Sequence, residues 1–392
     1  MGKLCCRIEK VKSRKISAFD AALSLGVMKH AKVYCASVVA RWPQWQNDHV
    51  VNIEPRTANI TFASMRSSAH GLTAQPIAFT PPFCFCCMTG AAFAATGGWL
   101  TPRQAFAEAR GLVTLIKDSA ASSPVTPYKL RGNVTVLEGS GGNIAVLTGP
   151  DGKLLVDAGI GVSRPQLTKN LSDLGPDPVA HLINTHWHFD HADGNDWLHS
   201  IGARIIAHEN TRKHLSEVQR VEDWDYNFLP SPAGAIPSEV ISANRALKLN
   251  GASIELKPYK PAHTDGDLSV TFGEADILHA GDTYWNGIYP FIDYSTGGSI
   301  DGMIAASDAN LAAATDSTII IPGHGKPVSN KSELKDFRNM LADIRDKVAA
   351  LKKAGRTQQE TVAAKPTAAH DAKWGQFVID PAFFTKLVYE GV

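Results

Sequence analysis

One short segment, "NTHWHFDHADGN" (Asn184–Asn195), concentrates side chains that can bind metal ions. It holds His186, His188, Asp190 and His191 directly after an apolar run. Placing so many polar groups beside an apolar strand costs free energy unless something binds them. The segment therefore favours a metal site over a solvated loop that happens to be rich in histidine.

Three further residues of the same chemical types stand where other apolar runs stop. "PAHTDGD" places His263 in a turn between two predicted strands, while "ILHAGD" and "TIIIPGHG" place Asp282 and His324 at strand ends. Strand ends on one side of a sheet are where active sites collect in such folds. No cysteine follows position 87. The set of imidazoles and carboxylates suits zinc, with iron or manganese as alternatives.

Strand geometry offers one way to align the first motif. Alternate residues of an extended chain face the same side, so we expect His186, His188 and Asp190 to point together, with His191 following in a turn. Nearby histidines are expected to be structural or to support the ligands, and nearby aspartates to support them or form turns. They are His181, His199, His208, His279, Asp193, Asp265 and Asp267.

Two aromatic segments lie downstream of the first motif, "DWDYNF" (Asp223–Phe228) and "TYWNGIYPFIDY" (Thr283–Tyr294). The second follows Asp282 directly. Aromatic side chains of this kind either wall a pocket for an apolar or aromatic substrate or pack into the core. The sequence favours neither interpretation.

Strands and helices alternate along the rest of the chain from Thr101, where "TPRQ" has the features of a helix start. Predicted strands cover 133–137, 143–147, 153–156, 179–184, 204–207, 253–256, 268–272, 276–280 and 317–321, and predicted helices cover 164–173, the region of Trp197, 211–217 and 331–353, with another capping box at Thr357. This order predicts the α/β (α+β) class, a mixed sheet core covered by helices.

Residues 1–99 show little periodicity and are predicted to be a poorly structured extension before a catalytic domain at 100–392 with C-terminal helices. The extension holds a signal-like stretch from Met65, with an arginine, an apolar run and "AFAA". If this stretch is a signal peptide, the mature protein begins near residue 96 and is periplasmic or secreted. If it is an extension or a mistaken upstream start, the protein is cytoplasmic.

Composition narrows the choice of partners. The chain has 392 residues, 44% of them hydrophobic, and a formal net charge of +1, so it can bury a large core without a strongly basic surface. We expect no nucleic-acid partner and, because no apolar run reaches about 18 residues, no stable membrane insertion. A small-molecule substrate is expected, and no oligomeric state is predicted. The six cysteines are not expected to form a metal site, because "FCFCC" lacks a second half.

Taken together, the motifs resemble those of the metallo-β-lactamase-fold hydrolase superfamily over roughly residues 127–330. The residues that carry the resemblance are the H-x-H-x-D-H motif, the three later ligands in family order, and "LLVDAG" (Leu154–Gly159) with Asp157. The resemblance implies a four-layer αββα sandwich with a two-metal site at one edge of the paired sheets.

The resemblance also implies how the ligands divide. One metal would be bound by His186, His188 and His263, the other by Asp190, His191 and His324, and Asp282 would bridge them. Two Zn²⁺ ions with these ligands and a bridging hydroxide would keep about one positive charge, which favours a developing oxyanion. The hydroxide would attack a carbonyl carbon, and Asp190 would act catalytically by orienting it.

Such a site predicts hydrolysis of a small-molecule amide, lactone, ester or thioester, and β-lactamase-like activity is among the possibilities. The Asp282 bridge resembles the broader hydrolase and glyoxalase-II-like branches, although we identify no basic clamp for glutathione. The alternatives are a nuclease of the same fold, which would need a surface for phosphates, and a mono-iron sulfur dioxygenase. His188 argues against the oxygen-reducing iron branch, which has glutamate there. A non-catalytic binding module is disfavoured because every ligand position is filled.

Overall fold

The computed structural model describes residues 4–9, 32–37 and 111–392. The chain divides into two units, Met1–Thr89 and Gly90–Val392. In the first unit, the backbones of β1 (Leu4–Glu9) and β2 (Lys32–Ser37) pair in antiparallel fashion.

Two of the sequence-based expectations concern residues that the structure does not describe. The signal-like stretch from Met65 and the helix start at Thr101 both lie outside the described residues. From Gly111 the chain is described, and α3 (Leu112–Ala120) is its first helix there. No helix in the described ranges is both long and apolar enough to span a bilayer.

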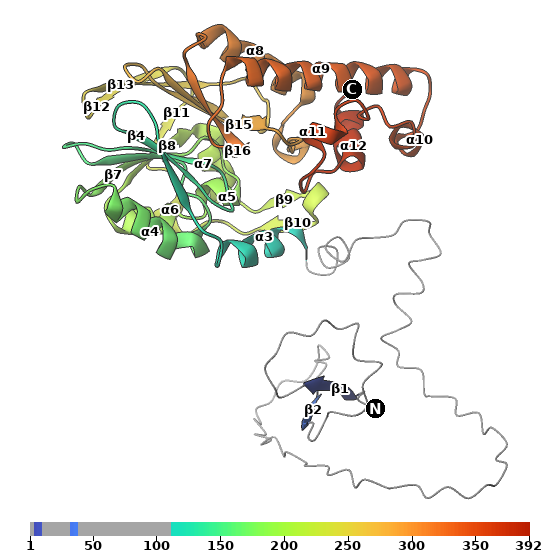
Figure 1. The fold of residues 1–392 in the computed structure, drawn as a ribbon, viewed down its shortest axis with the longest axis horizontal. Coiled ribbons are helices and arrows are strands. Elements are labelled where there is room, and N and C mark those ends of the chain that lie inside the picture. The colour runs from blue at the N-terminus through green and yellow to red at the C-terminus, as the bar shows by residue number, and fades with distance from the viewer. Residues whose placement is uncertain (1–3, 10–31, 38–110) are drawn as a thin grey trace, which may run out of the picture. The chain divides into compact units, whose positions relative to one another are not determined.

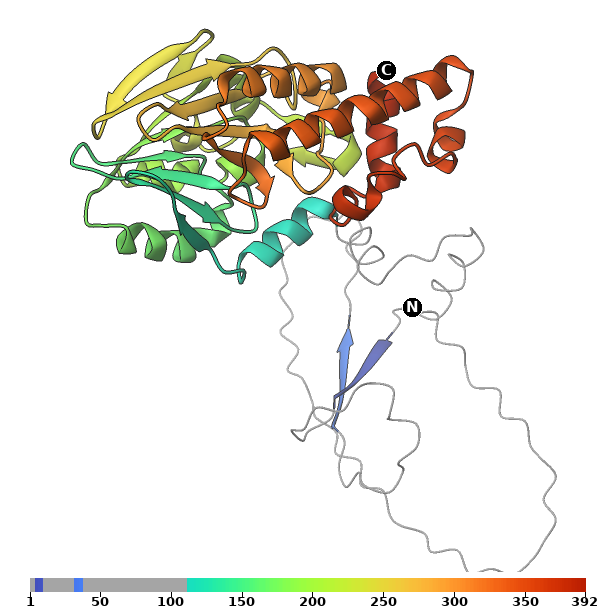
Figure 2. The same ribbon diagram turned by 45° about the horizontal axis from the view of Figure 1, so that its top comes forward.

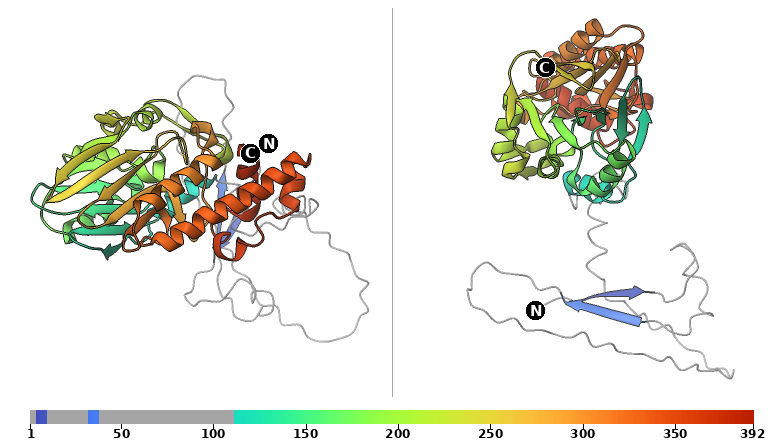
Figure 3. Two further views of the ribbon diagram at one scale, coloured as in Figure 1. Left: turned by 90° about the horizontal axis from the view of Figure 1, so that it is seen from above. Right: turned by 90° about the vertical axis from the view of Figure 1, so that its left-hand side faces the viewer.

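Within residues 111–392 the strands form two large mixed sheets that pack face to face (Figure 1; Figure 3). The first sheet has the spatial order β11-β8-β7-β6-β5-β4-β3 and the second β12-β13-β14-β15-β16. The strands of the first sheet are β3 (Thr126–Lys129), β4 (Val134–Glu138), β5 (Ile144–Leu147), β6 (Lys153–Val156), β7 (Val179–Ile183), β8 (Arg204–His208) and β11 (Glu239–Ile241). Those of the second are β12 (Arg245–Leu249), β13 (Ala252–Pro258), β14 (Leu268–Phe272), β15 (Ile277–Asn286) and β16 (Ile319–Gly325).

Helices cover the outer faces of both sheets. α4 (Arg164–Asp173) and α6 (Asn195–Ser200) pack on the first sheet, and α8 (Ile300–Ala313) and α9 (Lys331–Lys353) lie on the second (Figure 2). The remaining helices are α5 (Phe189–Ala192), α7 (Glu209–Ser216), α10 (Gln358–Ala363), α11 (Asp371–Trp374) and α12 (Pro381–Gly391). The predicted α/β class and αββα sandwich are confirmed.

The main core lies between the two sheets. Val136 and Val156 of the first sheet pack in one cluster with Ile254, Phe272 and Ile321 of the second, and all five are almost fully buried. Burying a side chain of this kind stabilises the fold by about 1.5–3 kcal/mol relative to leaving it exposed. β4, β5 and β6 of the first sheet are buried on both faces, which is why they read as short apolar runs without alternation.

Several elements differ from the sequence-based expectation. The predicted strand at 276–280 is longer: β15 continues past Asp282 to Asn286, with irregular register between His279 and Gly281 and between Gly281 and Trp285. Helix α8 was not predicted, because its apolar residues contact both β15 and α9 and so do not form one stripe. The pair β9 (Gln219–Val221) and β10 (Tyr226–Phe228) was too short to be predicted.

Candidate metal centre

The seven predicted side chains come together in two adjacent groups. Within each group the candidate ligand atoms lie within 4.8 Å of one another. The first group is His186, His188, His263 and Asp282, and the second is Asp190, His191 and His324. They come from the β7–β8 connection with α5, the β13–β14 loop, β15 and β16.

The expected strand alternation does not align the first motif, and that prediction was wrong. β7 ends at Ile183, so His186 lies in the connection that follows the strand. His188 is the N-cap residue of α5, and Asp190 and His191 lie within that helix. The motif therefore reaches the centre through a bend and one helical turn.

Asp282 stands between the two groups. Its Oδ2 lies 3.3 Å from His263 Nε2 and 3.3 Å from His324 Nε2, and its Oδ1 lies 3.1 Å from His191 Nε2. The strand that carries His324 can come this close because residue 323 is glycine: a Cβ there would lie 1.9 Å from Asp282 Oδ1. The carboxylate is therefore placed to serve both groups.

The imidazoles are held from outside by acceptors. His188 Nε2 lies 2.9 Å from Asp293 Oδ2, His191 Nδ1 lies 2.8 Å from Asp157 Oδ2, and His263 Nδ1 lies 2.9 Å from the Phe291 carbonyl oxygen. Each outer nitrogen donates its proton to that acceptor, so in the neutral imidazole the inner nitrogen carries a lone pair. Asp293 and the Phe291 carbonyl were not predicted, since a single aspartate among aromatic residues was the only sequence signal.

The inner atoms are suited to cations. His188 Nδ1 and His263 Nε2 lie 2.9 Å apart and both present lone pairs, an arrangement that is repulsive unless a cation lies between them. His186 Nε2 is buried and has no hydrogen-bond partner among the described residues. Buried polar atoms are rarely left unpaired. Nitrogen and oxygen donors of this kind fit zinc.

The electrostatics of the centre also favour positive charge. Burial opposes protonation of His324, but the carboxylates of Asp282 and Asp190 outweigh burial and raise its pKa to about 9. Burial likewise opposes ionisation of Asp190, yet His191 and His324 lower its pKa to about 2. The carboxylates thus create a negative potential where cations would bind.

The neighbouring histidines and aspartates lie outside both groups. His279 Nε2 lies 2.9 Å from the Asn143 carbonyl oxygen, a structural contact. Asp267 accepts the backbone N–H groups of His263 and Thr264 and so shapes the loop that carries one ligand. The remaining residues are also separate from the centre: His181, His199, His208, Asp193 and Asp265.

The two aromatic segments divide between the centre and the core. The Trp224 ring lies 5.1 Å from the His188 ring and 4.6 Å from that of Phe291, and the Trp285 ring lies 4.3 Å from the His324 ring. Tyr289, in contrast, stacks on Phe384 of α12. Trp224, Phe291 and Trp285 therefore lie around the centre, whereas Tyr289 packs in the core.

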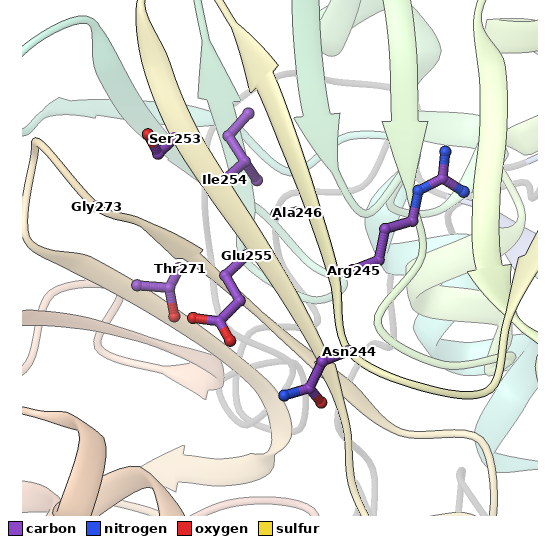
Figure 4. Close-up of a pocket in the computed structure, with 8 residues that line it drawn as sticks. All are labelled: Asn244, Arg245, Ala246, Ser253, Ile254, Glu255, Thr271 and Gly273. Carbon is purple, nitrogen blue, oxygen red and sulfur yellow. The ribbon is translucent and has the colours of Figure 1, made fainter.

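A separate hollow on the second sheet carries none of these groups (Figure 4). It is lined by Asn244, Arg245, Ala246, Ser253, Ile254, Glu255, Thr271 and Gly273. These residues belong to β12, β13, β14 and their turns, whereas the candidate ligands come from other segments. The hollow therefore has no part in the His/Asp centre.

A family model described as the metallo-beta-lactamase superfamily matches residues 137–346, more than half of the 392 residues. The chain belongs to the metallo-β-lactamase superfamily. The matched range holds all seven residues of the two groups.

Curated relatives match parts of this superfamily member. A hydroxyacylglutathione hydrolase from Polaromonas sp. is 26% identical over 148 residues, 37% of this chain and 48% of that protein. Another from Erythrobacter litoralis is 30% identical over 106 residues, 27% of this chain and 34% of that protein. An uncharacterized protein of Mycobacterium tuberculosis is 27% identical over 195 residues, 46% of this chain and 83% of that protein. The matches thus span about half or less of the two named hydrolases.

Solved structures support the superfamily fold. The stereoselective inverting sec-alkylsulfatase of Pseudomonas sp. has a TM-score of 0.52 at 15% identity, covering 68% of this chain and 50% of that one. A Cronobacter sakazakii metallo-β-lactamase has a TM-score of 0.50 at 20% identity, covering 61% of this chain and 99% of that one. At these identities the likeness concerns the fold alone.

Proposed function

We propose that the chain is a metal-dependent hydrolase of a small molecule, with two Zn²⁺ ions in its centre. The observation that carries this proposal is that two groups of candidate ligands meet at Asp282. Their inner atoms include a buried nitrogen, His186 Nε2, that has no hydrogen-bond partner among the described residues. His186, His188 and His263 would hold one ion, and Asp190, His191 and His324 the other. Asp282 would bind both.

Two cations held in this way polarise a carbonyl group and lower the pKa of a water molecule, which makes hydrolysis possible near neutral pH. Asp190 is the carboxylate that solvent can reach, since its side chain is 13% exposed and that of Asp282 is 2% exposed. We assign to Asp190 the orientation of the attacking water. Asp282, almost fully buried, serves the geometry of the centre.

The substrate class is a small carbonyl compound: a thioester, lactone, ester or amide, including a β-lactam. Thioesters gain support from the hydroxyacylglutathione hydrolases among the relatives. The aromatic rings of Trp224, Phe291 and Trp285 around the centre favour a substrate with an apolar portion.

The test combines metal analysis with a hydrolysis panel of a chromogenic β-lactam, a lactone, an aryl ester and a glutathione thioester. We expect about two zinc ions per chain and hydrolysis of at least one compound. One iron and no zinc would instead support a sulfur dioxygenase. Salt-sensitive RNA binding with RNA cleavage would support a nuclease.

A matched pair of histidine variants tests the ligand assignment. His188→Ala should lose metal and activity, because His188 contributes an inner nitrogen to the first group. His181→Ala is the control, since His181 lies on β7 and its Nδ1 makes no hydrogen bond to the described residues. Full metal content and full activity in His188→Ala would contradict the assignment.

A further inference from the structure

Two tryptophans beside the metal centre leave their indole N–H groups unpaired. The Nε1 atoms of Trp224 and Trp285 are buried and have no hydrogen-bond partner in the described part of the chain. Buried indole N–H groups usually find an acceptor. Trp187 illustrates the usual case, because it also lies beside His188 but donates to Thr296 Oγ1 at 3.2 Å.

Trp285 lies against both ligand groups. It follows Asp282 by three residues on β15 and is in register with His324 of β16. Its ring centroid lies 4.3 Å from that of His324 and 6.4 Å from that of His263. Only 6% of the residue is exposed, so its unpaired donor lies inside the protein and its ring lies next to the centre.

Trp224 approaches the first group from another segment. It lies in the tight connection of the β9–β10 hairpin, which is a two-stranded sheet of its own. Its ring packs 5.1 Å from His188 and 4.6 Å from Phe291, while the next residue, Asp225, has a side chain that is 91% exposed. The hairpin thus presents this indole to the centre and its charged residue to solvent.

With metal ions bound to their inner atoms, the ligands themselves cannot supply hydrogen-bond donors. The inner nitrogens of His188, His191 and His263 carry lone pairs, because their outer nitrogens donate to Asp293, Asp157 and the Phe291 carbonyl. Asp190 and Asp282 are acceptors when ionised. A bound molecule with several acceptor oxygens therefore needs donors from neighbouring side chains. The indole N–H groups of Trp224 and Trp285 are unpaired and belong to rings beside the centre.

We propose that Trp224 and Trp285 are substrate-binding residues that donate their indole N–H groups to the acceptor oxygens of a small carbonyl compound or its carboxylate product. The proposal rests on the proposed hydrolase function for the identity of the bound molecule. The aromatic rings on the first-group side place the apolar part of that molecule next to Trp224 and Phe291.

The direct test is NMR of the zinc-loaded full chain with ¹⁵N-labelled indoles, titrated with benzoate, which combines a carboxylate with an aromatic ring. The chain has eight tryptophans, and single Trp→Phe variants assign the three signals of interest. We expect the Trp224 and Trp285 indole protons to move downfield and that of Trp187 to stay. Absence of a shift at both would overturn the proposal.

Enzyme kinetics of the tryptophan variants provide the second test. Trp224→Phe and Trp285→Phe should each lower kcat/KM by about 10-fold, the effect of losing one hydrogen bond to the substrate, with zinc content unchanged. Trp197→Phe is the matched control, because Trp197 lies on α6 and packs with the cluster on the first sheet, and this variant should leave kcat/KM near that of the parent. Should a Phe variant fail to fold, β-(3-benzothienyl)alanine at the same position keeps the shape and removes only the donor.

The NMR titration and the kinetics distinguish a failure of the indole-binding proposal from a failure of the proposed hydrolase function. Benzoate-induced indole shifts in a protein that hydrolyses nothing on the panel would retain the binding site and reject the hydrolase. Hydrolysis by the parent, with unchanged kinetics in both tryptophan variants and unmoved indole signals, would reject the inference and retain the hydrolase.

Discussion

Asp157 and Asp293 hold imidazoles of different ligand groups by the nitrogen that faces away from the centre. Asp157 accepts from His191 Nδ1 at 2.8 Å and also binds the backbone N–H and hydroxyl of Thr185. Asp293 accepts from His188 Nε2 at 2.9 Å. Such partners fix the tautomer and orientation of a ligand and raise its basicity. Each aspartate should therefore influence mainly one metal position.

At the residue scale we predict that Asp157→Asn weakens zinc binding at the second group by about 10–100-fold and leaves the first nearly unchanged. Asp293→Asn should do the reverse. Competition with a chromogenic chelator resolves the two binding steps. The control is Asp193→Asn, because Asp193 accepts from the Gly161 backbone N–H and binds no ligand imidazole. If either variant lost the same zinc affinity at both groups, the assignment of each aspartate to one group would be wrong.

At the element scale, Asp276 ties the β14–β15 turn to the start of β16. Its carboxylate accepts from the hydroxyls of Thr318 and Ser317 at 2.6 and 2.8 Å, and Arg131 lies 3.4 Å away. The hydrogen bond from Thr318 is the largest cause of a lowered Asp276 pKa. A lowered pKa means that ionised Asp276 stabilises the fold above its unfolded pKa, near 3.8.

We therefore expect Asp276→Asn to reduce the free energy of unfolding by about 1 kcal/mol at pH 7, through weaker hydrogen bonds. The difference from the parent should shrink as the pH falls below about 4 and Asp276 of the parent takes up its proton. Urea unfolding at several pH values measures this difference, and Asp316→Asn, in the connection before β16, is the exposed control. A difference independent of pH would show that the charge of Asp276 does not matter.

At the scale of the whole molecule, the unit Gly90–Val392 holds both large sheets, their covering helices and the candidate metal centre. The described hydrophobic clusters draw on residues from Val113 onward. The family match, residues 137–346, also lies within this unit. The determinants of stability and metal binding that the structure describes are thus contained in it.

We predict that a chain of residues 90–392 folds alone and binds zinc with the stoichiometry of the full chain. Its Tm should fall within about 2–4 °C of the full-length value, the shift that ~1 kcal/mol produces at this size. Circular dichroism and metal analysis test this. Aggregation, or loss of the zinc sites despite an intact spectrum, would show that the first 89 residues support the catalytic unit.

Sequence patterns determined the α/β class and the seven residues that meet at the centre, and the resemblance to the superfamily supplied the four-layer sandwich. Buried strands read as short apolar runs, α9 reads as one apolar stripe, and residues of metal-binding type stand out after such runs, because all these signals are local. The same reasoning misplaced the first motif on a strand, since the bend after Ile183 and helix α5 depend on packing.

Only the tertiary structure decided which groups surround the ligands. Asp293 lies 105 residues from His188, the imidazole that it holds, and Trp224 belongs to a hairpin too short to be predicted. Contacts between segments so distant in sequence follow from how the two sheets and the hairpin pack, and no local pattern encodes them. The identities of the candidate ligands were therefore readable from the sequence, whereas their hydrogen-bond partners and the two unpaired indoles were not.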